Sequence, residues 1–408
     1  MSLFNIISTL LTITAIFSYL NYHYLKLPRT IGLMVITLIM SVGLIGLKSL
    51  GIVLVEQLVL LVKSIDFNKT LLQWMLCFLL FAGALHVNIN DLSEHKWTIT
   101  IFSTLSLVFS TFLIATLVYL LFYLFVIDIK FIYCLLFGAL ISPTDPIAVL
   151  GILKKAGAPK SLEINIVGES LFNDGVGVVI FLVLLSALSG NDFNYASIPF
   201  LFIKEALGGM FFGLIMGWFT YKMLKTVDDY QVEILITLAL VTGGYAFASA
   251  IHVSGPLAII VAGLVIGNHG RSYGMSDKTR EHLDLFWELI DEILNAILFI
   301  LIGLELLVLS FHWDYIWIAV LAIPLVLIVR LISVGIPIKL LKKHFPFSEN
   351  AIRIMTWGGL RGGLSIALAL SIPPGIEREI ILMMTYAIVI FSILVQGLTI
   401  KYLVKNDS

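Results

Sequence analysis

The chain alternates long apolar runs with short clusters of charged and turn-forming residues. A helix needs about 20 predominantly apolar residues to cross the hydrocarbon core of a bilayer, so each long run predicts one membrane span. The pattern predicts an all-α polytopic membrane protein with about thirteen spans. The expected spans cover residues 3–25, 31–50, 70–86, 97–126, 130–155, 163–188, 198–224, 231–250, 254–268, 285–310, 315–341, 350–372 and 379–402.

Composition supports a chain that is membrane domain throughout. It is 60% hydrophobic and only 12% charged, whereas soluble domains carry about 25% charged residues. We therefore expect no soluble regulatory domain and no cofactor. The net charge of −1 gives no basic excess that would suggest nucleic acid. Cys77 and Cys134 stand in apolar runs without other metal ligands nearby, which favours two packed thiols.

The placement of positive charge predicts the orientation. Cytoplasmic loops are enriched in Lys and Arg, and most of the 25 such residues fall on one side if the N-terminus is outside and the C-terminus is cytoplasmic. We expect this orientation in the cell membrane. A fourteenth helix at 52–62 would invert every later loop, so we reject it as a span.

Two expected spans are interrupted by residues that break helices. Span five contains Pro143 and Pro146 around Asp145, and span twelve has four glycines around Arg361. At membrane depth, backbone that lacks helical hydrogen bonds is tolerated only where it is buried inside the protein or lines a cavity. The breaks are seven spans apart, and this odd offset predicts two inverted six-helix repeats whose broken helices cross, the usual place of a transporter's binding site. Simple Pro or Gly kinks are the alternative.

Span six carries a dense set of polar residues. Ser170 and Asp174 share one helix face, four residues apart. Na⁺ prefers oxygen ligands, which Thr144, Asp145, Ser170 and Asp174 supply with the freed carbonyls of span five. Desolvation favours the protonated carboxyl and a bound cation favours the ionised one. Asp174 is thus expected to hold either Na⁺ or H⁺, which couples their exchange, while Asp145 can instead stabilise helix ends.

Glu169, beside this set, reads as a structural residue. A buried glutamate with a cationic partner is an ion pair, and either Arg330 in span eleven or Arg361 in span twelve could supply the guanidinium.

The chain resembles the NhaP-type monovalent cation/proton antiporters across most of its length. The resemblance is carried by SPTDP at 142–146, GESLFNDG at 168–175, WGGLRGG at 357–363, FWE at 286–288 and LIGLE at 301–305. It implies a homodimeric Na⁺/H⁺ exchanger that works by alternating access, accepts Li⁺ as a second cation and serves pH homeostasis. The implied parts are a dimerisation scaffold (1–96 and 231–310), a translocating core (97–188 and 315–404) and a linker helix (198–224).

The resemblance also implies residue roles. Asp174 carries the ion and the proton, and Asp145, Thr144 and Ser170 are further cation ligands. Asn173 replaces a second Asp found in electrogenic relatives, which implies electroneutral 1:1 exchange. Glu169 orients Asn173 and pairs with an arginine, for which Arg330 is the closer match.

One departure keeps a second cation open. Many family members carry Glu where Ala82 stands, so K⁺/H⁺ exchange is the alternative. A cation channel would need a continuous polar pathway, and an intramembrane hydrolase with Asp145 and Asp174 as an acid/base pair lacks a nucleophile with a partnered base. Both are remote alternatives.

Overall fold

The computed structural model describes residues 3–48, 75–145, 149–151, 153, 158–189, 198–271, 274–307, 315–343, 347–348 and 350–404. Within these ranges the regular elements are helices, and the β-type pairing is one isolated bridge. The predicted all-α fold class is confirmed. Pro146 and the segment 52–62 lie outside the described residues.

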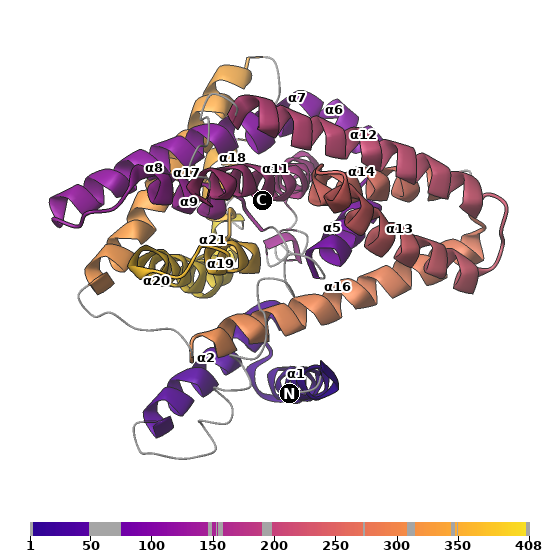
Figure 1. The fold of residues 1–408 in the computed structure, drawn as a ribbon. Helices are drawn as coiled ribbons and strands as arrows, with labels where there is room; N and C mark the ends of the chain where they lie inside the picture. Colours follow the sequence, from indigo (N-terminus) through magenta and orange to yellow (C-terminus); the bar gives the residue numbers. More distant parts are fainter. Residues whose placement is uncertain are drawn as a thin grey trace.

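The helices follow the apolar runs closely (Figure 1). The first half of the chain contains α1 (Leu3–Leu20), α2 (Arg29–Lys48), α5 (Leu76–Leu85), α6 (Ile89–Glu94), α7 (Lys96–Thr100), α8 (Leu107–Leu124), α9 (Phe131–Ile141) and α11 (Lys160–Ser189). The second half contains α12 (Ile198–Leu224), α13 (Tyr230–Ala250), α14 (Gly255–Val265), α16 (Asp277–Glu305), α17 (Ile316–Leu341), α18 (Ala351–Trp357), α19 (Gly363–Leu370), α20 (Ile376–Phe391) and α21 (Gly397–Val404). Short π-helical turns, η1 (Asn21–Leu25), η3 (Ile101–Ser106), η5 (Ile266–Gly270) and η7 (Ser392–Gln396), continue or join these helices.

Eight helical runs in the described chain are long and apolar enough to cross a membrane, and three shorter apolar helices accompany them. The predicted count of thirteen spans stays a prediction. Two further expected spans do not reach this length and hydropathy. Helix α16 carries many acids, and the span expected at 350–372 is divided into α18 and α19 by the glycine-rich break.

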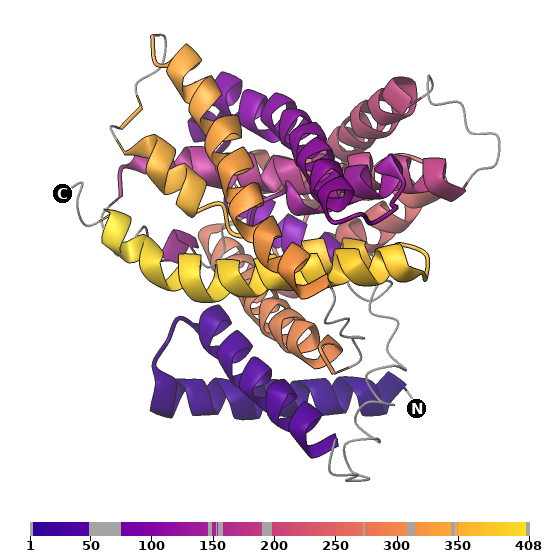
Figure 2. The ribbon, with the colours of Figure 1, turned by 90° about the vertical axis from the view of Figure 1, so that its left-hand side faces the viewer.

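Contacts between helices fall into two groups. In one, α9, α17 and α19 pack with α8 and α20; in the other, α5, α14 and α16 pack with α2, α12 and α13. Helix α11 contacts both groups, and α16 also contacts α19. Figure 2 shows α1 and α2 side by side at one end of the molecule, next to the long run that ends in α21. The two groups therefore meet at α11 and where α16 contacts α19.

Glycines allow α12 to pack tightly on α14. A Cβ at Gly209 would lie 2.5 Å from the carbonyl oxygen of Ser254, and one at Gly217 would lie 3.0 Å from the Cα of Ala262. Small residues at intervals of four let helix backbones approach in a membrane, where close packing replaces the hydrophobic driving force.

Candidate cation-binding site

Helix α9 ends where its sequence can no longer donate backbone hydrogen bonds. Pro143 lacks an N–H group, and the helix stops at Ile141. The chain then bends through Ser142 and Pro143 to Asp145, whose N–H donates to the carbonyl oxygen of Leu360 at 2.8 Å in an antiparallel bridge. Leu360 lies between α18 and α19, so the two broken segments cross, as the sequence predicted.

Arg361 stabilises the crossing. Its side chain is buried and donates from Nη1 to the carbonyl oxygens of Ser142, at 2.5 Å, and Pro143, at 2.7 Å. Its backbone N–H donates to the hydroxyl of Ser392. A helix C-terminus carries partial negative charge, so the guanidinium satisfies carbonyls that the break leaves without helical partners.

Helix α11 attaches to the same break through two side chains. The hydroxyl of Ser170 donates to the carbonyl oxygen of Thr144. Asn173 donates from Nδ2 to the Thr144 hydroxyl at 3.0 Å, and its Oδ1 accepts from the Thr144 N–H at 3.4 Å. All three side chains are buried. The Asn173 amide therefore holds Thr144, whereas the resemblance implied an amide oriented by Glu169.

Glu169 pairs with Arg330 of α17. Arg330 donates to both carboxylate oxygens, at 2.5 and 3.1 Å, and also to the carbonyl oxygen of Met355 at 3.3 Å. The two charged side chains are 2% and 8% exposed. A bidentate geometry of this kind is what makes a buried pair tolerable. Arg330 is thus the partner of Glu169, and Arg361 is engaged at the break.

Asp174 lies at a cavity of about 580 Å³ between the two helix groups. Asp145 and Ser170 line the same cavity, with Pro143 and Gly362 from the two breaks. The charged neighbours of Asp174 are Asp145 and Arg361. Thr144 is not among the cavity-lining residues, and its hydroxyl and carbonyl oxygens accept hydrogen bonds from Asn173 and Ser170. The structure thus brings Asp174, Asp145 and Ser170 to one cavity.

The comparisons identify the family. The transmembrane sodium/hydrogen exchanger family model matches residues 10–406. The chain belongs to this family.

Full-length relatives are similar as well. The chain is 50% identical over 408 residues to the Na⁺/H⁺ antiporter NhaP of Pseudomonas aeruginosa, covering 98% of this chain and 96% of that protein. It is 35% identical over 389 residues to the Na⁺/H⁺ antiporter NhaH of Halobacillus aidingensis, covering 94% of this chain and 92% of that protein. The solved sodium proton antiporter of Methanocaldococcus jannaschii shares the fold, with a TM-score of 0.76 at 18% identity, over 100% of this chain and 99% of that one.

Sequence reasoning did not predict three of the residues that line the cavity of this exchanger-family member. Glu288, Asp291 and Asn295 on α16 line the cavity that reaches Asp174. Asn295 donates to Asp291 at 3.0 Å. The acids of this helix recur at intervals of three and four residues, a spacing that by itself indicates the solvated face of an amphipathic helix. The face is polar as expected, but it borders the cavity, and the continuation of its spacing to Asn295 inside an apolar stretch was the available signal.

The position that departs from the family pattern is inside α5. Ala82 is 2% exposed, and its neighbour Gly83 lines the cavity. The carboxylates that line the cavity come instead from α16, the α9 break and α11.

Proposed function

We propose that this chain exchanges Na⁺ for H⁺ across the membrane by competition of the two ions for the carboxylate of Asp174. It acts as a secondary transporter and not as an enzyme. The observation that carries the proposal is the joining of Asp174, Asp145 and Ser170 at one cavity in the crossing of two broken helices. Oxygen ligands at a break are what a desolvated alkali cation requires.

Na⁺ is favoured over K⁺ because several relatives, including the 50% identical one, are named Na⁺/H⁺ antiporters. Cation ligands in this proposal are the carboxylates of Asp174 and Asp145, the Ser170 hydroxyl and an oxygen of Thr144, which keeps a lone pair beside the hydrogen bond that it accepts. Ser170 donates its only proton to Thr144, so its lone pairs remain for a cation.

Electroneutral 1:1 exchange follows if Asp174 is the one carboxylate that changes state. The preceding residue is Asn173, whose amide is hydrogen-bonded to Thr144. An amide does not ionise, so it cannot exchange a proton for a cation. Glu169 is neutralised by Arg330 and serves as a support. Arg361 supports the α9 break by donating to its carbonyl oxygens, and Pro143, which lacks an N–H group, keeps the helix from continuing there.

Alternating access would use the boundary between the two helix groups. The group with α9, α17 and α19 is the moving core, and the group with α5, α14 and α16 is the scaffold that forms a homodimer. Support comes from the position of the cavity, whose walls are drawn from both groups. In the proposed orientation the N-terminus is outside and the C-terminus is cytoplasmic, as the distribution of Lys and Arg predicts.

The test is transport by purified protein in liposomes with an imposed pH gradient and an internal pH dye. Wild type should collapse the gradient on addition of Na⁺ or Li⁺, and equally with the membrane potential clamped to zero. Asp174→Asn should not exceed empty liposomes, because an amide does not exchange a proton for a cation. The matched control is Asp228→Asn, an exposed aspartate in the turn between α12 and α13, which should retain wild-type exchange. Exchange by Asp174→Asn, or collapse by K⁺ alone, would refute the proposal.

A further inference from the structure

A second cavity, of about 500 Å³, adjoins the one at Asp174 and has a different chemistry. The two cavities share His86 and Val87. Where the first is lined by carboxylates, the second is lined by Arg271 and Arg280 together with histidines and asparagines, and no carboxylate is among its described lining residues. Two guanidinium groups at one polar cavity indicate a site for an anion.

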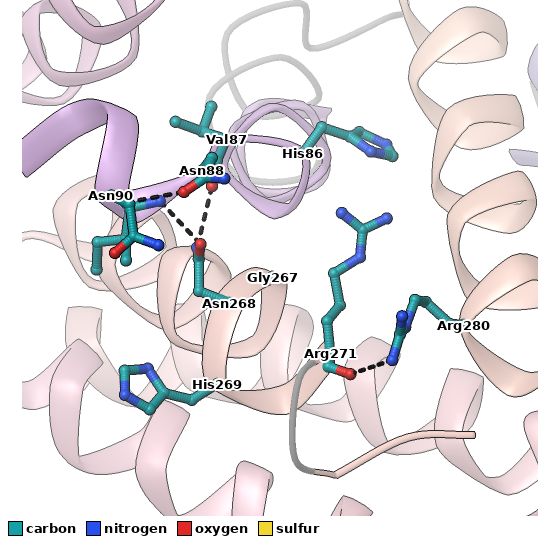
Figure 3. Close-up of a pocket in the computed structure, with 10 residues that line it drawn as sticks. His86, Val87, Asn88, Asn90, Gly267, Asn268, His269, Arg271 and Arg280 are labelled. Carbon is teal, nitrogen blue, oxygen red and sulfur yellow. Dashed lines mark hydrogen bonds between the residues drawn. The ribbon is translucent and has the colours of Figure 1, made fainter. Parts of the chain in front are cut away.

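The cavity wall is held together by Asn268 (Figure 3). Its amide nitrogen donates to the carbonyl oxygens of Val87 and Leu264, at 3.0 and 2.8 Å, and its oxygen accepts from the N–H of Ile89 at 2.8 Å. This one side chain ties the turn between α5 and α6 to η5. Two segments that line the site are therefore bonded directly to each other.

The two arginines are pre-positioned. Arg280 donates from Nη2 to the carbonyl oxygen of Arg271 at 2.6 Å, and Arg271 pairs with Asp284. In Figure 3 the Arg271 side chain extends toward the level of His86, with Arg280 beside it. Preorganised guanidinium groups lose less entropy when they bind a ligand.

Their positive charge is only partly compensated. Arg280 is 3.4 Å from Asp277, but that carboxylate is 99% exposed, so solvent weakens the pair. The Nε atoms of both arginines are buried, and within the described chain neither has a hydrogen-bond partner. Arg271 and Arg280 line the cavity together, so their guanidinium groups can donate to one acceptor with several oxygens.

We infer that this cavity binds a phosphate-bearing anion, through Arg271 and Arg280. Phosphate matches the planar fork of a guanidinium, presents oxygens to several donors at once and carries the charge that the cavity lacks. A volume of this size also accommodates the group to which a phosphate is attached. The phosphate can come from a free anion or from a lipid headgroup.

Bound phosphate affects the cation cavity through α16. Asp284, Glu288 and Asp291 are spaced by four and three residues and so share one face of that helix, and the last two line the cation cavity. Phosphate that binds Arg271 competes with Asp284 for it. A released Asp284 carboxylate adds uncompensated negative charge to this face of α16. The consequence for transport rests on the proposed function. We expect bound phosphate to lower the KM for Na⁺ by about five-fold, which is the low end of typical coupling between two binding sites.

The first experiment measures binding without transport. Radiolabelled inorganic phosphate is titrated onto purified wild type, Arg280→Gln and Arg353→Gln in a neutral detergent at constant ionic strength. Arg353 is an exposed arginine on α18, away from the cavity, and serves as the charge-matched control. We expect Arg280→Gln to lose about ten-fold in affinity and Arg353→Gln to match wild type. Arg280→Lys keeps the charge without the fork and should bind weakly while preserving the fold.

The second experiment separates the two sources and the consequence for transport. Na⁺-driven exchange is measured in phosphatidylcholine liposomes with and without phosphatidic acid, and with and without inorganic phosphate. A lower KM with either source in wild type and Arg353→Gln, but not in Arg280→Gln, supports the site and names its source. The inference is overturned if neither source binds or lowers KM, or if Arg353→Gln loses as much as Arg280→Gln. Phosphate binding to a protein that fails to exchange Na⁺ would refute the proposed function while leaving the site.

Discussion

At the level of single residues, most buried charges and freed carbonyls around the site have a partner of opposite charge beside them. Glu169 has Arg330, and the carbonyls freed by the break have Arg361. Asp174 differs, because the described chain provides it with no hydrogen-bond donor although charged neighbours are near. A carboxylate without a fixed partner is the one that can exchange its counterion.

The buried pair predicts a large loss of stability when one partner is removed. Glu169→Gln or Arg330→Met should destabilise the protein by about 3–5 kcal/mol, because the remaining charge is buried without a counterion. The double variant Glu169→Leu/Arg330→Met should lose less than either single one. The measurement is thermal unfolding of purified protein in detergent.

A surface pair provides the comparison. Lys160 and Asp91 are 3.2 Å apart, with the lysine 76% exposed, and Lys160→Ala should change stability by less than about 1 kcal/mol. Equal effects of Lys160→Ala and Glu169→Gln would contradict the role assigned to the buried pair.

Sequence reasoning located most site residues but not their contacts. Asp174, Asp145 and Ser170 could be found because charges and hydroxyls in apolar spans are conspicuous. The family resemblance favoured Arg330 over Arg361 as the partner of Glu169, and Arg330 is the residue that pairs with it. Residue spacing alone left both open, because it does not encode how helices distant in the chain cross. The same holds for Asn173, which bonds across the break to Thr144.

At the scale of elements, the crossing depends on the absence of side chains at its glycines. A Cβ at Gly362 would lie 2.9 Å from the Cβ and 3.0 Å from the Cγ of Asp145, and one at Gly359 would lie 2.7 Å from Nε of Arg330. The glycines of span twelve are therefore required by close approach.

Gly362→Ala should abolish exchange and lower thermal stability, because the new methyl group displaces Asp145 from the crossing. Gly243→Ala is the matched control: Gly243 lies in α13 with nothing within 4 Å of its added Cβ, so the change should leave exchange intact and add helix propensity of up to about 1 kcal/mol. Both are tested by transport and unfolding assays. Wild-type activity in Gly362→Ala would show that the crossing tolerates displacement.

Element boundaries show what the apolar pattern can predict. The range 198–224 was predicted as the structure has it, because charge and turn residues end it sharply. Helix α16 begins earlier than the expected span, at Asp277, where the Ser276 hydroxyl caps it by accepting from the N–H of Thr279. Its charged first turns are helical because a capped and partly solvated helix needs no apolar run.

At the scale of the whole molecule, the orientation in the membrane gives a labelling prediction. Val126 is 92% exposed in the turn after α8, and Thr226 is exposed in the turn after α12. Val126→Cys should react with a membrane-impermeant maleimide from outside the cell, and Thr226→Cys only after the membrane is opened. The native Cys77 and Cys134 are buried and should give a low background. Labelling of both variants from the same side would contradict the orientation.

If Na⁺ and H⁺ compete for the carboxylate of Asp174, Na⁺ binding must release a proton. Na⁺ is titrated into the purified protein by calorimetry in two buffers with different heats of ionisation, between about pH 5 and 8, and the difference in heat counts the protons released. We expect release approaching one proton per Na⁺ where the site is protonated, and neither binding nor release in Asp174→Asn. Na⁺ binding without proton release across this range, or unchanged release in Asp174→Asn, would contradict it.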